Sequence, residues 1–251
     1  MIRGELDMPV WALSACLRWD NLGEGHPIIA ESPVWRSEQA DRENDEAARF
    51  VLAQRGLFDG SGRLDADLRD SLIVLARPGV EFSCWAKDTE GSYRALVAAI
   101  GRDVVLVVRG NEHLWLRGVS SERPAEELVA QLPAREPARA HAVNVRRSDY
   151  DALRAPSDGI ISRRDGDSEA RRLQAILERP RLYAAEFHGA TRDRSGIRRR
   201  ARQLALLDTE QGRWLISRRP GRAPDDDWIV AAPGNPHNLT NALYEMRDHT
   251  R

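Results

Sequence analysis

Residues 197–233 restrict the fold more than any other stretch, because they predict three strands in direct succession. Side chains alternate over residues 202–209, a Glu-Gln-Gly turn follows, and residues 213–218 and 227–232 form two further strand segments. Glycine and short polar residues suit such tight turns. Parallel neighbours would need a long crossover, so these strands can pair only as an antiparallel meander.

Helices are expected on both sides of this meander. Residues 168–179 carry apolar side chains at helical spacing, and a strand at 182–188 follows them. After the meander, Asn235 is suited to the N-cap of a helix at 237–246, and Pro236 is suited to its first position. The second half of the chain therefore predicts a helix, a four-strand meander and a closing helix.

The first half repeats this order. Its helix ends in Arg77-Pro78, just as the later helix ends in Arg179-Pro180. The expected elements are a helix at 65–76, strands at 80–87, 93–100, 104–109 and 113–119, and a helix at 124–132. The composition of 93–100 allows strand or helix, and the hairpin turn before it favours strand. Two further helices are expected at 10–20 and 37–56.

These elements predict an α+β fold, in which a quasi-twofold antiparallel sheet from two helix–meander–helix lobes is flanked by helices. We expect residues 1–251 to form a single domain. Lobe one spans about 37–133, a connector with many prolines, alanines and arginines spans 134–167, and lobe two spans about 168–247.

The charge balance excludes a general attraction to nucleic acid or anionic membrane, since the formal net charge is −1. The chain is 41% hydrophobic, which is enough for a real core. Cys16 and Cys84 give neither a disulfide framework nor zinc spacing, and no apolar run approaches the roughly 20 residues of a membrane span. We therefore expect a cytoplasmic protein.

Motifs of known catalytic or metal chemistry do not occur in the sequence. The six histidines are scattered without zinc spacing, and no nucleophile elbow, phosphate loop or dinucleotide fingerprint is present. The three aspartates at 225–227 would point in different directions from a loop, which favours a solvated loop over a metal site. We expect no enzyme activity, no catalytic or metal-binding residue and no cofactor.

A basic run extends from Arg192 to Arg202 and has two interpretations. It could contact phosphates, but it contains no aromatic residue for base stacking. In a chain with 38 basic residues of which only Lys87 is lysine, a solvated arginine-rich strand is the simpler interpretation.

One group of residues points toward a protein partner. The predicted wet side of the first lobe's strands carries Trp85, His113, Trp115 and Arg117. Tryptophan and arginine are enriched at binding hot spots, so these four are the candidate partner-binding residues. The alternative is that a helix covers this face and the tryptophans belong to the core.

Three stretches resemble the EspG family of actinobacterial type VII (ESX) secretion. They read EAARFVLAQRGLFDGSGRLDADLRDSLIVLARPGVEF, LLDTEQGRWLISRR and DWIVAAPGNPHNLTNAL, and the likeness extends over about residues 38–243. The resemblance implies a quasi-twofold antiparallel sheet flanked by helices. It also implies a cytosolic chaperone that binds the helical tip of a secreted PE–PPE-like heterodimer through the sheet face and the C-terminal helical region.

No partner-contact residue follows from this resemblance. We expect a monomer or weak homodimer that contacts neither nucleic acid nor membrane. The alternatives are a generic protein-binding adaptor and, third, a nucleic-acid-binding protein.

Overall fold

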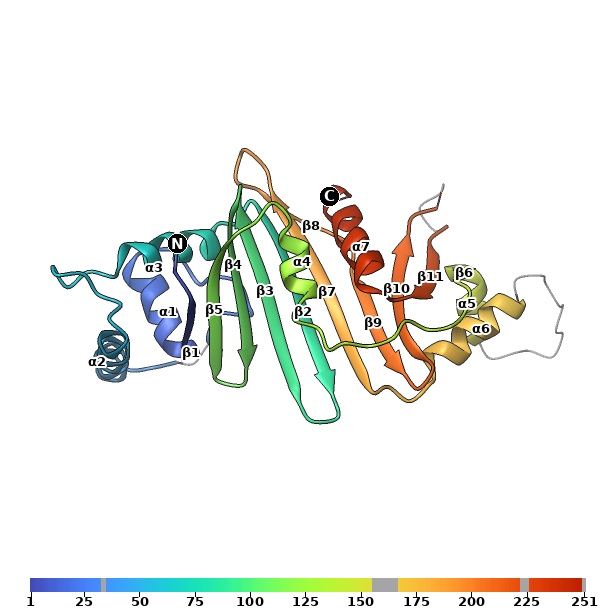
Figure 1. Cartoon of the computed structure of the whole chain (residues 1–251), viewed down its shortest axis with the longest axis horizontal. Coiled ribbons are helices and arrows are strands. Elements are labelled where there is room, and N and C mark those ends of the chain that lie inside the picture. Colours follow the sequence, from blue (N-terminus) through green and yellow to red (C-terminus); the bar gives the residue numbers. More distant parts are fainter. Residues whose placement is uncertain (33–34, 155–166, 222–225, 250–251) are drawn as a thin grey trace.

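Eleven strands form one antiparallel sheet in the computed structural model, which describes residues 1–32, 35–154, 167–221 and 226–249 (Figure 1). The strands are β1 (Glu5–Pro9), β2 (Val80–Asp88), β3 (Ser92–Ile100), β4 (Asp103–Gly110), β5 (His113–Ser120), β6 (Val143–Arg146), β7 (Tyr183–Arg192), β8 (Arg198–Arg200), β9 (Leu204–Thr209), β10 (Gly212–Arg219) and β11 (Trp228–Pro233). The helices are α1 (Val10–Trp19), α2 (Glu38–Gln54), α3 (Ala66–Ala76), α4 (Pro124–Val129), α5 (Arg147–Arg154), α6 (Asp167–Leu177) and α7 (Pro236–Asp248).

The strand order is symmetric about the pair β2–β7. The sheet reads β1-β5-β4-β3-β2-β7-β9-β10-β11-β6, with β8 paired to β7 outside this path. Moving outward from the centre, β3 matches β9, β4 matches β10, β5 matches β11 and β1 matches β6. Helices precede β2 and β7 and follow β5 and β11. The predicted α+β architecture, a large antiparallel sheet flanked by helices, is confirmed.

The stretch predicted as a connector contains structure that the sequence did not indicate. Within 134–167, β6 pairs with β11, and α5 follows it directly; residues 155–166 lie outside the described part of the chain. Strand β6 is only four residues long, so Val143 and Val145 are too few to reveal an alternating pattern. At the other edge of the sheet, β1 pairs with β5, also in antiparallel orientation.

Local sequence signals fix several helix starts. The Asp65 carboxylate accepts hydrogen bonds from the backbone N–H groups of Asp67 and Leu68 at the start of α3. Asn235 accepts one from Asn238 at the start of α7, where Pro236 is the first residue. These side chains satisfy amide groups that have no partner inside the helix. The N-cap at Asn235 is as predicted.

The two sheet faces are covered in different places. Helices α4 and α7 lie over the middle of one face, which we call the α4/α7 face (Figure 1). There Phe82, Phe187 and Leu206 pack with Leu128 and Leu243 of the helices. On the opposite face, α1 and α3 cover lobe one, and α6 with α5 covers the outer strands of lobe two. The middle of that opposite face lies between the two helix groups.

A buried ion pair anchors the β9–β10 hairpin. Arg213 donates to both carboxylate oxygens of Asp208, at 2.7 and 2.8 Å, and to the carbonyl of Pro133 at 2.9 Å. The Tyr183 ring lies 5.8 Å from this guanidinium, and its hydroxyl is 2.8 Å from that of Tyr93. Pairing makes these buried charges tolerable, and the bond to Pro133 holds the chain that leaves α4 against the hairpin.

Candidate partner-binding surface

An open cavity of about 850 Å³ lies on the opposite face, and we call it the central trough. Its floor is formed by β2, β7, β9 and β10. Trp85, Glu186, Ala205 and Ile216 stand directly opposite one another across these four strands, and therefore point to the same face. The floor thus offers a row that is mostly apolar, at the middle of the sheet.

Two histidines surround the indole of Trp85. The ring of His188 lies 4.8 Å from it at 85°, and the ring of His26 lies 6.0 Å from it at 43°. His26 is 8% exposed, and its Nδ1 accepts the backbone N–H of Ile28 at 3.1 Å. The ring contact with Trp85 places the loop before α2 against the central strands, next to the trough.

Burial lowers the pKa of both histidines. The pKa of His26 falls to about 4, first through loss of hydration and then through the positive charges of Arg198, His188 and Arg200. The pKa of His188 is also lowered, mainly by burial, although Glu186 opposes the shift. Both rings are therefore neutral at physiological pH and act as aromatic surface.

The border of the trough is basic. Five cationic side chains line it, against two carboxylates, Glu186 and Asp227. Asp227 is already bonded to Arg202 at 3.1 Å, and Asp226 lies 3.7 Å from Arg146. The aspartates at 226 and 227 therefore form ion pairs with arginines, and Asp225 lies outside the described residues.

The four predicted partner-binding residues do not share one face. Trp85 lies opposite Arg94, which lies opposite Arg109, which lies opposite Leu114, so Trp85 and Leu114 share a face. Side chains alternate along a strand, so His113 and Trp115 on either side of Leu114, and Arg117 two residues beyond Trp115, all point to the α4/α7 face. The prediction of a common face is wrong. The apolar side chains of β2, such as Phe82, pack on the α4/α7 face, whereas those of β5, such as Leu114, pack on the opposite face, so the polar positions of the two strands also lie on different faces.

On the α4/α7 face, Trp115 is 42% exposed. Arg117 forms an ion pair with Glu127 of α4 at 3.3 Å, so its guanidinium already has a partner within the chain. Trp85 is half-buried at the trough. The sequence did not indicate that His26 and His188 are neighbours of Trp85. His188 could have been found from the alternation of its strand, but no sequence signal places the distant loop of His26 beside Trp85.

The basic run from Arg192 to Arg202 is largely engaged inside the protein. Arg198 pairs with the buried Glu81, Arg199 lies 3.4 Å from Asp193, and Arg192 donates to the carbonyl of Gly196 at 2.7 Å. These contacts shape the β7–β8 hairpin. They favour the simpler interpretation of the run over a phosphate-binding strip.

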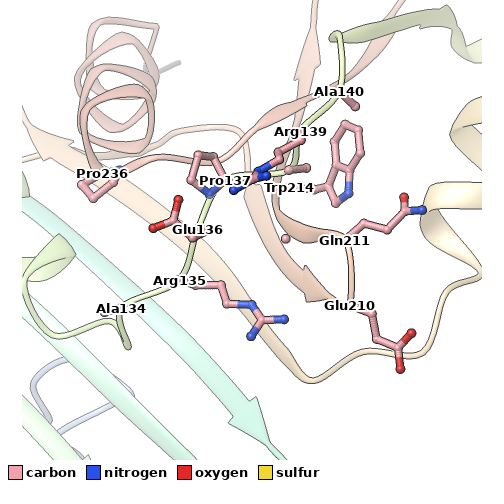
Figure 2. A pocket seen from close by; sticks show the side chains of 12 residues that line it. Ala134, Arg135, Glu136, Pro137, Arg139, Ala140, Glu210, Gln211, Trp214 and Pro236 are labelled. Carbon is pink, nitrogen blue, oxygen red and sulfur yellow. The ribbon is translucent and has the colours of Figure 1, made fainter.

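A second cavity of about 940 Å³ lies where residues 134–140 cross the β9–β10 turn (Figure 2). The crossing is fixed by Arg213, whose N–H donates to the Glu136 carbonyl and whose carbonyl accepts the N–H of Ala138, each at 2.9 Å. Figure 2 shows the charged side chains of Arg135, Glu136 and Glu210 pointing in different directions. The cavity therefore lacks convergent groups that could act together on a reacting molecule.

Among the described residues, no three or more histidine, cysteine, aspartate and glutamate side chains gather as metal ligands would. None of the helices in the described ranges has the length and apolar character needed to cross a bilayer. Burial raises the pKa of Cys16 to about 12 and that of Cys84 to about 12, so neither thiol is a ready nucleophile.

Fold and site together define a class of protein: a two-lobed antiparallel sheet that leaves the middle of one face open between helices. The chain belongs to the EspG family, whose family model matches residues 9–245. No curated protein matched the chain in a sequence search.

A solved structure has the same fold over almost its entire length. It is the type VII secretion system chaperone EspG5 of Mycobacterium tuberculosis, in complex with a PE25–PPE41 dimer. The match covers 99% of this chain and 98% of that chain, with a TM-score of 0.71 and 13% sequence identity. At this identity the likeness establishes the shared fold.

Proposed function

We propose that this chain is a type VII secretion chaperone that binds the helical tip of a PE–PPE-like heterodimer. The observation that carries the proposal is the end-to-end fold match to EspG5, whose structure holds such a dimer, together with membership of the EspG family. The chain acts stoichiometrically in the cytoplasm, without a catalytic step or nucleotide. The chaperone covers the apolar tip of its partner until a competing protein that binds more tightly displaces it.

The central trough is the contact surface in this proposal. It is supported by the half-buried Trp85 and the ring of His188, which both line the trough, because aromatic residues in partly closed pockets supply much of the energy of protein interfaces. Ala184 and Ile216 of the trough also pack against the cluster that α6 covers, so a helical tip seated on the sheet would lie beside α6. Of the four residues predicted from sequence, Trp85 is kept as a contact, whereas His113, Trp115 and Arg117 face away from the trough.

The test is co-expression with PE–PPE-like pairs from the same genome, followed by calorimetry of the purified complex. Trp85→Ala should weaken binding by about 1–4 kcal/mol, as hot-spot truncations do. Ala205→Arg should block the centre of the floor while removing no core contact. Trp115→Ala, which truncates a tryptophan on the other face, is the matched control and should bind like the unaltered chain.

Circular dichroism of each variant separates loss of binding from loss of fold. Failure of the unaltered chain to bind any PE–PPE-like pair would refute the function. Weakened binding by Trp115→Ala, with Trp85→Ala and Ala205→Arg unaffected, would move the contact to the α4/α7 face.

A further inference from the structure

The charges around the trough are distributed unlike those of the chain as a whole. The complete chain has a formal net charge of −1, whereas five cationic side chains and two carboxylates line the trough. One of those carboxylates, Asp227, is neutralised by Arg202. The surface left for a partner is therefore positively charged, on a protein that is close to neutral.

Two of these cations flank the apolar floor at diagonally opposite corners. Lys87 stands two residues beyond Trp85 on β2, and Arg218 stands two residues beyond Ile216 on β10. Residues two apart on a strand share a face, so both point to the side of the trough. Both side chains are exposed, and within the described ranges of the chain neither takes part in an ion pair.

The neighbouring histidines respond to the same positive charge. Arg200, which lines the trough, disfavours protonation of both His26 and His188, in addition to the larger effect of burial. A group that enters the trough therefore meets an electrostatic environment that favours anions. Complementary charge at an interface border mainly sets partner choice and association rate.

We infer, on the basis of the proposed function, that the trough selects a helical tip whose apolar end residues are flanked by aspartate or glutamate side chains. The apolar end occupies the row from Trp85 to Ile216. The flanking carboxylates pair with Lys87 and Arg218. A tip of the same shape with lysine or arginine in the flanking positions is rejected by like-charge repulsion.

The experiment uses a helical-hairpin peptide with two leucines at its tip and a glutamate on either side, and a twin with glutamine in place of both glutamates. The glutamate hairpin should bind the complete chain about tenfold more tightly than its twin at low ionic strength. This advantage should disappear at about 1 M salt, where the screening length falls to about 3 Å.

Lys87→Glu combined with Arg218→Glu should abolish the preference for the glutamate hairpin. Arg42→Glu is the control, since it makes the same charge reversal as either single substitution of the double variant, but on α2, at the end of the molecule (Figure 1). Equal binding of the two hairpins, binding of neither, or an equal effect of the control would overturn the inference. Were the double variant not to fold, the comparison of hairpins on the unaltered chain would still decide it.

The same variants separate this inference from the proposed function. Binding of a PE–PPE-like pair that is unchanged by Lys87→Glu with Arg218→Glu would overturn the charge selection and leave the chaperone function standing. Absence of any binding to such pairs by the unaltered chain would remove both.

Discussion

At the residue scale, His26, which contacts Trp85, makes the stability of the fold depend on pH. Its folded pKa is about 4, whereas an unfolded histidine titrates near 6.5, so the unfolded chain binds more protons between these values. Its contribution is therefore complete above about pH 6.5 and is lost as the pH falls toward 4. The charged or titratable groups around it are Arg198, His188 and Arg200.

The free energy of unfolding should fall by about 2 kcal/mol between pH 7 and pH 5, as measured by urea denaturation. His26→Asn should remove most of this decrease, because the Asn side-chain oxygen can still accept the Ile28 N–H and does not titrate. His188, whose pKa is also lowered, supplies the remainder. His141→Asn, at an exposed position, is the control, and a flat profile for the unaltered chain would contradict the prediction.

At the scale of elements, the β9–β10 hairpin depends on Gly212. Its φ is +109°, and a Cβ there would lie 2.8 Å from the carbonyl oxygen of Pro137. Gly212→Ala should therefore cost about 2 kcal/mol or more, through backbone strain and displacement of the crossing chain. Gly91→Ala in the β2–β3 turn meets nothing within 4 Å and should change the free energy of unfolding by less than about 0.5 kcal/mol. Equal urea-denaturation midpoints for the two variants would show that residues 134–140 are not held tightly against the β9–β10 turn.

The sequence predicts the order of the central strands well, because alternation and turn residues are local signals. It does not predict which face each strand presents, since a change of one residue in a turn reverses that assignment. Strand β2 shows the difficulty: Glu81, Phe82, Ser83 and Cys84 are all buried, because both sides of the sheet are covered there. For this reason Trp85 could be predicted as a contact residue, but its separation from Trp115 could not.

At the scale of the whole molecule, the two lobes are joined by a core cluster beneath α4 and α7 to which both contribute. The β2–β7 pair runs from Val80 opposite Thr191 to Asp88 opposite Tyr183, and joins the lobes by a full strand. On the α4/α7 face, Phe82 of lobe one packs in the same cluster as Phe187 and Met246 of lobe two. The lobes match in strand order, but neither can expose its inner strand without breaking this cluster.

We therefore expect the lobes to unfold together. Phe187→Ala should destabilise the chain by about 3–5 kcal/mol, because it leaves a cavity beneath the central helices. Amide hydrogen exchange should then show lost protection to a similar extent in β4 of lobe one and β10 of lobe two, as in a single cooperative unit. Phe50→Ala removes a side chain that is 65% exposed on α2, and should leave protection unchanged in both strands. Loss of protection confined to β10 would mean that the lobes unfold independently, and that the symmetry of the sheet reflects two stability units instead of one.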